Sequence, residues 1–317
     1  MRFVSADDID AVLTFPELID TLTEAFVASG ANPPRHHHAI GSGDPHATHL
    51  IMPAWTTGAP GEGQFLGTKL VNVFPGNGAL GLPAVLGTYV LQSGQTGQPL
   101  AILDGTRLTH WRTAAASGLA ARYLAAPDAA ALTMVGAGAL APFLVRAHAA
   151  VRSIRRVTVW NHRAAGAERL AADLRRGGFD ATASSNLQAA VAEADIVSCA
   201  TLSGVPLVEG RWLKAGSHLD LVGAFNLAMR EADDEALRLC RIYVDTPAAL
   251  EEGGEVALGL RSGIITSSDV VADLHDLARG VATGRRTADE RTLFKSVGAS
   301  LEDLAAAILV WQRLARE

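Results

Sequence analysis

The chain has 317 residues, of which 49% are hydrophobic and 19% are charged, and its formal net charge is −6 at pH 7. This composition excludes a disordered chain, because enough apolar surface is available for a core, and the length favours two domains. The negative charge and the scattered Lys and Arg residues argue against a nucleic-acid partner, and no apolar stretch reaches the roughly 18 residues of a membrane span. The N-terminus turns acidic where a signal peptide needs an apolar core, so we expect a cytoplasmic protein.

The N-terminal region is predicted to begin with one amphipathic helix and to continue as a sheet. Residues 14–17 (Thr-Phe-Pro-Glu) are a typical helix start, and apolar residues follow at helical spacing up to about Ser29. After Pro33-Pro34 come short β-rich segments separated by Gly, Pro and Asn, which predict strands at residues 35–40, 47–52, 65–74, 84–92 and 100–104. With residues 93–98 as a hairpin loop, we expect an antiparallel meander.

The pattern changes at Thr113, where an alanine-rich helix begins that Pro127 ends, and we expect this helix to bridge two domains. Strand and helix patterns then alternate, as is typical of βαβ units and a parallel sheet, at residues 132–135, 143–151, 156–160, 165–174, 196–200, 218–222 and 242–245. Residues 301–314 indicate a last amphipathic helix. The predicted fold class is α/β: a Rossmann dinucleotide-binding domain at residues 113–295, and an α+β domain with a mainly antiparallel sheet at residues 1–112 and 296–317.

A glycine-rich loop follows the first strand of the predicted Rossmann domain. It reads Gly136-Ala137-Gly138-Ala139-Leu140-Ala141, and Pro142 then opens a helix. Gly136 permits a tight turn, Gly138 lets the backbone approach a pyrophosphate, and Ala141 lets the helix pack close to the strand. A glycine pattern alone is weak, but this one lies between a strand and a helix of a βαβ unit, so it predicts dinucleotide binding rather than a structural turn.

The end of the next strand indicates which dinucleotide is bound. An NAD-selective site places Asp or Glu there on the ribose hydroxyls, whereas this chain has Asn161, followed by His162 and Arg163. A neutral residue with a nearby cation suits a 2′-phosphate. We therefore expect NADP(H) in preference to NAD(H), although Arg163 could instead be a solvated residue at a helix start.

Cysteines and histidines offer two further hypotheses. Cys199 and Cys240 are the two cysteines of the chain, and both lie in apolar segments, so we expect buried free thiols rather than a disulfide. The run of histidines at residues 36–38 places His36 and His38 on one face of a strand and His37 on the other. Because no Cys or Glu partner follows at zinc-ligand spacing, we expect a surface or pocket lining and no metal.

The sequence resembles the ornithine cyclodeaminase and mu-crystallin family, and within it the branch that reduces cyclic ketimines such as 1-pyrroline-2-carboxylate. The resemblance covers nearly the whole chain. Besides the glycine loop, it is carried by Pro34-Arg35, Met52-Pro53-Ala54-Trp55, Gly67-Thr68-Lys69-Leu70-Val71, Phe74-Pro75-Gly76-Asn77, Arg112-Thr113-Ala114-Ala115-Ala116-Ser117, Met229-Arg230-Glu231-Ala232-Asp233-Asp234-Glu235 and Phe294-Lys295-Ser296-Val297-Gly298.

This resemblance implies a homodimer, in which the N-terminal β domain supplies the subunit contact and the substrate pocket and the C-terminal helix folds back onto that domain. It also implies that Arg35, Lys69 and Arg112 face the substrate, with Lys69 as a catalytic residue. The expected cofactor contacts are Thr113, Gly136, Ala137, Gly138, Ala139, Leu140, Asn161, His162, Arg163, Cys199, Ala200, Thr201, Val222, Gly223, Ala224 and Val297.

Three basic residues indicate the substrate class. Lys69 lies mid-strand and is either an edge-strand charge or a buried cation that awaits an anion; Arg112, just before the bridging helix, is either solvated or a bidentate carboxylate ligand. The assignment of Arg35 depends mainly on the resemblance. Three cations would repel one another without a ligand, and the carboxylate of a small α-imino or α-keto acid would relieve that repulsion.

One position departs from the family pattern. The branch normally has an aspartate just before Met229-Arg230-Glu231 as the acid/base near the substrate nitrogen, but this chain has Ala228 there and Phe225 at the other possible position. Neither can move a proton. Cyclodeamination of ornithine depends on a positioned base, so reduction of an imine is the activity expected to survive, with Lys69 the first candidate substitute among Lys69, His49, His110 and Asp104. A cyclodeaminase and a non-catalytic, mu-crystallin-like binding protein stay open as alternatives.

Overall fold

The computed structural model describes residues 1–28, 30–41, 47–57 and 64–315. The chain divides into two compact units, one made of Met1–Thr113 and Ala299–Glu317 and the other of Ala114–Gly298. None of the described helices has the length and apolar character that crossing a membrane requires.

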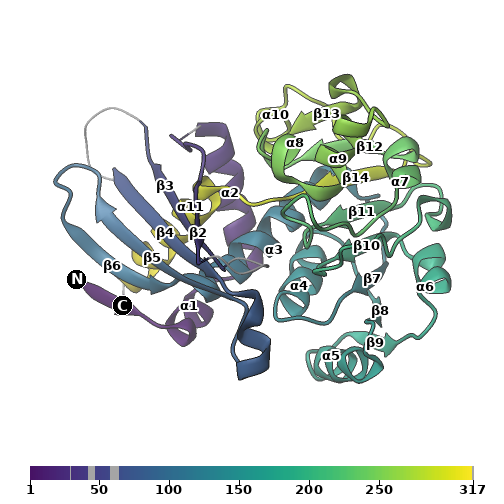
Figure 1. Cartoon of the computed structure of the whole chain (residues 1–317), viewed down its shortest axis with the longest axis horizontal. Coiled ribbons are helices and arrows are strands. Elements are labelled where there is room, and N and C mark those ends of the chain that lie inside the picture. The colour runs from purple at the N-terminus through teal and green to yellow at the C-terminus, as the bar shows by residue number, and fades with distance from the viewer. Residues whose placement is uncertain (29, 42–46, 58–63, 316–317) are drawn as a thin grey trace. The chain divides into compact units, whose positions relative to one another are not determined.

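A six-stranded sheet in the order β1-β6-β5-β4-β3-β2 forms the first unit (Figure 1). Its strands are β1 (Arg2–Val4), β2 (His36–Ile40), β3 (Ala47–Trp55), β4 (Phe65–Val73), β5 (Val85–Ser93) and β6 (Pro99–Asp104), with a 3-10 turn, η1, at Pro75–Leu80. Strands β2 to β6 pair antiparallel, as predicted, whereas β1 pairs parallel to β6 and was not predicted.

The first unit has the helices α1 (Ala6–Val12), α2 (Phe15–Ala28) and α11 (Ser300–Leu314); α11 packs on the sheet, and α2 packs against α11. Helix α1, which the sequence analysis missed, starts with a capping box between Ser5 and Asp8. Helix α2 matches the predicted helix and buries one apolar face. The C-terminal helix α11 packs against β3, β4, β5 and α2, so it carries its first turn into the core of the first unit.

Helix α3 (Gly105–Leu124) starts eight residues before the predicted start at Thr113. Asp104, the last residue of β6, caps it by accepting a hydrogen bond from the backbone N–H of Arg107 at 2.8 Å. Gly105 allows the close approach, since a Cβ there would lie 2.7 Å from the carbonyl carbon of Gly87. The prediction that Arg112 precedes the helix is therefore wrong: Arg112 lies inside it.

An eight-stranded parallel sheet in the order β13-β12-β14-β11-β10-β7-β8-β9 forms the second unit and confirms the α/β fold class with a Rossmann-type sheet. The strands are β7 (Ala131–Val135), β8 (Arg156–Trp160), β9 (Asp180–Ala183), β10 (Ile196–Cys199), β11 (His218–Leu221), β12 (Arg241–Val244), β13 (Val270–Asp273) and β14 (Thr292–Lys295). Strands β9, β13 and β14 were not predicted.

The helices of this unit are α4 (Ala141–Val151), α5 (Ala164–Arg176), α6 (Leu187–Glu193), α7 (Asp234–Leu239), α8 (Ala249–Glu252), α9 (Gly254–Ser262) and α10 (Leu274–Ala278), with 3-10 turns η2 (Gly210–Trp212) and η3 (Ser267–Asp269). Helices α4 and α5 match the predicted pattern of strand followed by helix. The end of α3 completes the unit.

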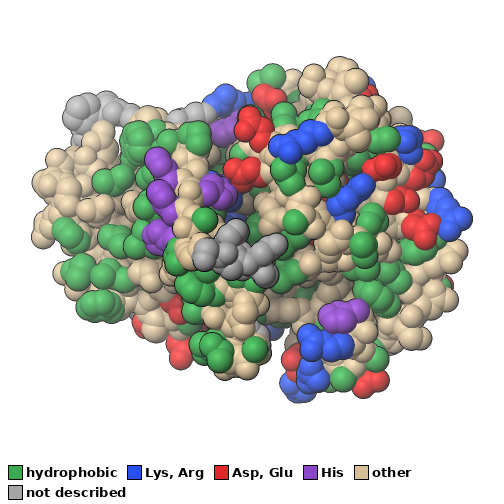
Figure 2. Space-filling model, in the orientation of Figure 1, with side chains coloured by type: hydrophobic (Ala, Val, Ile, Leu, Met, Phe, Trp, Pro, Cys, Tyr) green, Lys and Arg blue, Asp and Glu red, His purple; other side chains and the backbone are tan. Residues whose placement is uncertain are grey.

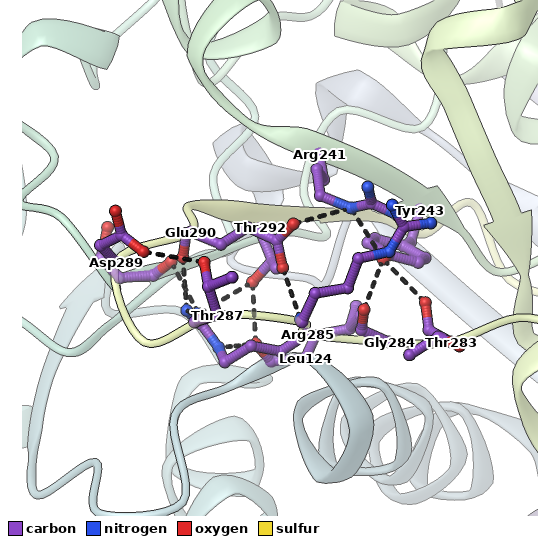
Figure 3. A network of polar contacts seen from close by, with 12 residues as sticks. Leu124, Arg241, Tyr243, Thr283, Gly284, Arg285, Thr287, Asp289, Glu290 and Thr292 are labelled. Carbon is purple, nitrogen blue, oxygen red and sulfur yellow. Dashed lines mark hydrogen bonds and ion pairs between the residues drawn. The ribbon is translucent and has the colours of Figure 1, made fainter.

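The segment that leads into β14 is held by a polar network (Figure 3). Arg285 Nε donates to the carbonyl oxygen of Leu124 at 2.8 Å, and the hydroxyl of Tyr243 donates to the carbonyl oxygens of Thr283 and Gly284 at 3.2 and 3.0 Å. These contacts replace regular secondary structure between α10 and β14, so they fix the start of a strand that ends in a fully buried lysine, Lys295.

Candidate active site

The glycine loop joins β7 to α4 in the way that a dinucleotide phosphate requires. Gly136 has φ +107°, and a Cβ there would lie 2.6 Å from the carbonyl oxygen of Ala200. By contrast, a Cβ on Gly138 would meet no described atom within 4 Å, so the backbone at Gly138 faces open space. Pro142 stands in the first turn of α4. The residues present therefore fit a pyrophosphate held against backbone N–H groups at a helix N-terminus.

The turn after β8 carries an exposed basic side chain, that of Arg163. Asn161 Nδ2 donates to the carbonyl oxygen of Arg163 at 2.9 Å and lies against Gly166, so the amide shapes the turn that starts α5. Arg163 is the N-cap of α5, and its side chain, like that of His162, is exposed. The turn contains no carboxylate for a ribose diol.

The other expected cofactor residues are two groups and two single residues. Cys199 ends β10 and residues 200–201 follow it, residues 222–224 follow β11, and because these strands neighbour each other both groups lie at the carboxyl edge of the sheet. Cys199 is fully buried, and burial together with nearby carboxylates raises the pKa of its thiol well above the usual value. Val297 follows β14, whereas Thr113 belongs to the first unit.

In the first unit, Lys69 and Arg112 lie together with two carboxylates that sequence reasoning did not identify. Lys69 Nζ is 2.6 Å from Asp303 Oδ2, and Arg112 donates to Asp303 Oδ1 at 2.9 Å and to Glu302 Oε2 at 2.8 Å. We call Lys69, Arg112, Glu302 and Asp303 the cationic cluster. All four side chains are buried, with Lys69 1% and Arg112 5% exposed.

This arrangement decides between the alternatives for Lys69 and corrects one expectation. Strand β4 lies between β3 and β5 and Lys69 is buried, so it is a buried cation and not an edge-strand charge. The expectation that only a ligand relieves the repulsion between the cations is wrong. Glu302 and Asp303, in the first turn of α11, already balance the charges of Lys69 and Arg112. The signal in the sequence was an adjacent acidic pair at the start of a helix that is otherwise apolar.

Burial and neighbouring charges shift the pKa values of Lys69 and Arg112. Burial, the charge of Arg112 and, more weakly, that of Arg35 lower the pKa of Lys69 to about 8, although Asp303 opposes them. Burial also acts against the charge of Arg112, but Asp303 and Glu302 more than offset it, so the pKa of Arg112 is raised. Arg35 is half-buried and precedes β2, and its effect on Lys69 places its charge near the cluster.

Tyr89 is a second group that the sequence analysis missed. It pairs with Lys69 across β4 and β5, is fully buried, and its hydroxyl has no hydrogen-bond partner among the described residues. A Cβ on Gly67 would lie 1.9 Å from this hydroxyl, so only glycine leaves room for it. Burial and the charge of Asp303 raise the pKa of Tyr89 well above its usual value, which keeps the hydroxyl protonated.

The candidate substitutes for the missing aspartate have different surroundings. His49 Nδ1 lies 2.9 Å from Asn72 Oδ1, and Asp104 caps α3. Burial lowers the pKa of His110, and the charges of Arg107 and, more weakly, of Arg112 contribute. Lys69 belongs to the cluster through its contact with Asp303, which also binds Arg112. At the departing position itself, Ala228 is exposed and its N–H donates to Asn226 Oδ1 at 2.9 Å, while Phe225 is half-buried.

His36, His37 and His38 are exposed on the edge strand β2, and histidine side chains gather on the visible face of the first unit (Figure 2). In the part of the chain that the structure describes, no three His, Cys, Asp or Glu side chains are placed to hold a metal ion. Cys199 and Cys240 are free and buried, which confirms that prediction.

A parallel sheet with a glycine loop at its carboxyl edge, followed by a helix, defines a dinucleotide-binding protein of the Rossmann class. The model of the ornithine cyclodeaminase/mu-crystallin family matches residues 2–317. The chain belongs to this family, which confirms the resemblance.

Three similar proteins cover almost the whole chain. Protein SAR DEFICIENT 4 of Arabidopsis thaliana is 39% identical over 97% of this chain and 96% of its own length. The Delta(1)-pyrroline-2-carboxylate reductase of Paracoccus denitrificans is 38% identical over 96% of this chain and 95% of its own length. The structure of the Thermococcus litoralis Delta(1)-pyrroline-2-carboxylate reductase in complex with NADH and L-proline superposes with a TM-score of 0.94 at 30% identity, covering 100% of this chain and 98% of that one.

Proposed function

We propose that this protein is an NAD(P)H-dependent ketimine reductase. Its substrates are small cyclic or open-chain α-imino acids of the 1-pyrroline-2-carboxylate or 1-piperideine-2-carboxylate type, and its products are L-amino acids such as proline. The observation that carries the proposal is the buried cationic cluster, in a chain that also has a phosphate-binding loop. The names of similar proteins, two of them pyrroline-2-carboxylate reductases, support the same chemistry.

The basic side chains around the cluster suit a monoanionic substrate. Glu302 and Asp303 pair with Lys69 and Arg112, and the charge of Arg35 acts on Lys69 from nearby. These three basic side chains favour the binding of a substrate carboxylate. Arg112 is suited to bind that carboxylate in bidentate fashion, since its planar guanidinium is already oriented by two carboxylates.

Lys69 is proposed as the group that moves the proton. With a pKa of about 8 it is mostly protonated at pH 7 and yet can release a proton to the imine nitrogen. The dinucleotide, when bound, supplies the hydride for the imine carbon. The C=N bond thereby becomes a C–N single bond, with one proton from Lys69 or from an imine that enters already protonated. Asp303, 2.6 Å from Lys69, stabilises the ammonium form before and after the step.

NADP(H) is the proposed cofactor, with NAD(H) as a possible substitute. The exposed Arg163 and the neutral Asn161 support binding of a 2′-phosphate. The phosphates themselves are assigned to residues 136–140.

We also propose a homodimer in the cytoplasm, with residues 1–112 and 296–317 as the substrate-binding and dimerisation domain and 113–295 as the cofactor domain. The exposed edge strand β2 supports a subunit contact, because unpaired edges favour further pairing. Two free buried cysteines suit a reducing compartment.

One assay tests the proposal against its two rivals. Purified protein is mixed with NADPH or NADH and with 1-pyrroline-2-carboxylate or 1-piperideine-2-carboxylate, and cofactor absorbance and amino-acid product are followed. Consumption of cofactor with formation of proline or pipecolate supports the reductase. Proline and ammonia formed from ornithine would establish a cyclodeaminase instead, and cofactor binding without any turnover would establish a binding protein.

A further inference from the structure

A single buried carboxylate, that of Glu231, connects the ends of two neighbouring strands in the second unit. Its Oε1 accepts hydrogen bonds from the backbone N–H of Thr201 at 2.6 Å and from the hydroxyl of Thr201 at 2.9 Å. Its Oε2 accepts from the backbone N–H of Gly223 at 2.7 Å and of Ala224 at 3.3 Å. Thr201 lies just after β10 and Gly223 just after β11, so both turns depend on the same side chain.

The turns that Glu231 holds are in tight contact with each other and with the glycine loop. A Cβ on Gly223 would lie 2.0 Å from the carbonyl oxygen of Thr201 and 2.5 Å from Glu231 Oε1. A Cβ on Gly136 would lie 2.6 Å from the carbonyl oxygen of Ala200. The carboxyl ends of β7, β10 and β11 therefore form one interlocked edge, in which a shift of either turn displaces the loop proposed to bind phosphate.

Glu231 is itself held by two further buried charges. Its backbone N–H donates to Glu255 Oε1, and Glu255 Oε2 lies 3.0 Å from Lys295 Nζ at the end of β14. Glu231, Glu255 and Lys295, which we call the Glu231 cluster, are all fully buried. Burying these carboxyl groups is costly, and the four donors on Glu231 and the contact of Glu255 with Lys295 compensate for that cost.

The place of these turns in the sheet assigns them to one end of the dinucleotide. Ligands of open α/β sheets lie at the carboxyl ends of the strands. Strand β8, with Arg163 after it, is on one side of β7, whereas β10 and β11 are on the other. If the phosphates lie on the glycine loop and the 2′-phosphate lies near Arg163, the nicotinamide end lies over the turns after β10 and β11.

We propose that Glu231 is a positioning residue for the nicotinamide end of the cofactor: through the N–H groups of Thr201, Gly223 and Ala224 it fixes the two turns on which that end rests. This inference depends on the proposed function for the identity of the ligand. Glu255 and Lys295 act through Glu231, since neither donates to or accepts from the turns itself.

The second unit offers a matched control in Asp220 of β11. Asp220 is also fully buried and also accepts several hydrogen bonds, from Ser117 Oγ at 2.9 Å, Ser198 Oγ at 2.7 Å and His148 Nε2 at 3.1 Å. All three donors are side chains, and none belongs to the turns. Asp220→Asn therefore perturbs a buried carboxylate of the same unit without releasing the turns.

The test compares Glu231→Gln, Glu231→Asp and Asp220→Asn with the wild-type protein. Dissociation constants for NADPH and NADH are measured by fluorescence titration, and hydrogen exchange is followed in peptides containing residues 200–203 and 222–225 without cofactor. For Glu231→Gln we expect both dissociation constants to rise roughly tenfold and both peptides to exchange faster, because an amide group cannot accept from all four donors. Glu231→Asp, which keeps the charge but has a shorter reach, should show the same changes to a smaller extent.

Asp220→Asn is expected to lower the melting temperature while leaving the dissociation constants and the exchange of the two turns near their wild-type values. An unchanged dissociation constant in Glu231→Gln, or an equal rise in Asp220→Asn, would overturn the proposal. If Glu231→Gln fails to fold, Glu231→Asp decides in the same way. Wild-type protein that binds NADPH but reduces no imine refutes the proposed function and leaves this binding test intact; wild-type protein that binds neither nucleotide refutes both.

Discussion

The two units of the molecule each bury a group of opposite charges, and the two groups are built differently. In the cationic cluster the three ion pairs each join one side chain to another, from β4, α3 and α11. In the Glu231 cluster the central carboxylate accepts mainly from backbone N–H groups.

This difference distinguishes a group of side chains that can bind a ligand from a group that fixes the position of the backbone. Side chains that pair with one another can exchange part of that pairing for a ligand's carboxylate, because rotation about side-chain bonds is cheap compared with moving a strand. A carboxylate anchored to main-chain donors cannot change partners unless the turns move. The cationic cluster is therefore suited to binding a substrate. The Glu231 cluster is suited to fixing the turns after β10 and β11, at the edge of the sheet proposed to bind the cofactor.

The largest expected effect comes from removing Arg112. Arg112→Met leaves Glu302 and part of Asp303 without a cation, so we expect stability to fall by about 3 kcal/mol or more. The value of kcat/KM for an anionic imine should fall roughly 10³-fold, since a bidentate carboxylate ligand is lost. Thermal melts and steady-state kinetics check both effects.

Adding Glu302→Gln to Arg112→Met separates the two contributions. The double variant should recover part of the lost stability, because one unpaired carboxylate is removed, and recover none of the activity. Recovery of activity together with stability would mean that Arg112 has a purely structural role.

The second-largest expected effect is a pH dependence of turnover that is set by Lys69. Because the pKa of Lys69 is lowered to about 8, Lys69 is protonated below pH 8 and neutral above it. If the protonated form binds and donates, kcat/KM falls as pH rises through 8, by about tenfold for each further unit. A profile that stays flat up to pH 10 would contradict the role of Lys69.

Cofactor binding should respond to pH in the opposite direction. Burial is the main reason why the pKa of Glu231 is raised to about 7: Lys295 and the hydrogen bonds from Thr201 oppose this rise, and the charge of Glu255 adds to it. Protonation as pH falls through 7 removes acceptors from the turns, so NADPH should bind roughly threefold to tenfold more weakly at pH 6 than at pH 8. The charged and titratable groups around Glu231 are Glu255, Lys295 and Cys199, and Asp220 beyond them. Titration of cofactor fluorescence across this range measures the change, and Glu231→Gln should lack it.

The smallest effect is expected outside both clusters, at Arg163. Because this side chain is exposed, Arg163→Ala should weaken NADPH binding by roughly fivefold and leave NADH binding unchanged. Equal affinities of the wild-type protein for NADPH and NADH would refute the proposed preference.

The sequence by itself determined the features that depend on local pattern. A strand, then the segment from Gly136 to Ala141, then a helix: this order predicts a cofactor-binding loop. It does so because Gly136, Gly138 and Ala141 each meet a local steric requirement of such a loop. Short β-rich segments between Gly, Pro and Asn predict the meander, and alternation of strand and helix patterns predicts the parallel sheet. Lys69 and Arg112 were identified as candidate substrate ligands for two reasons: they are charged residues in segments expected to be buried, and they match the motifs of the family.

Tertiary structure alone decided which charges meet. Arg112 and Asp303 are 191 residues apart in the chain, and no periodicity relates them. Tyr89 reaches Lys69 through the register of β4 and β5, and Lys295 meets Glu255 because β14, a strand of four residues, inserts between β11 and β12. Even the start of α3 at Gly105 depends on a cap and a close contact with Gly87. Propensity and periodicity are local properties, whereas ion pairing in a core is set by packing between segments distant in sequence, so the pairing of the site could not be read before the fold was known.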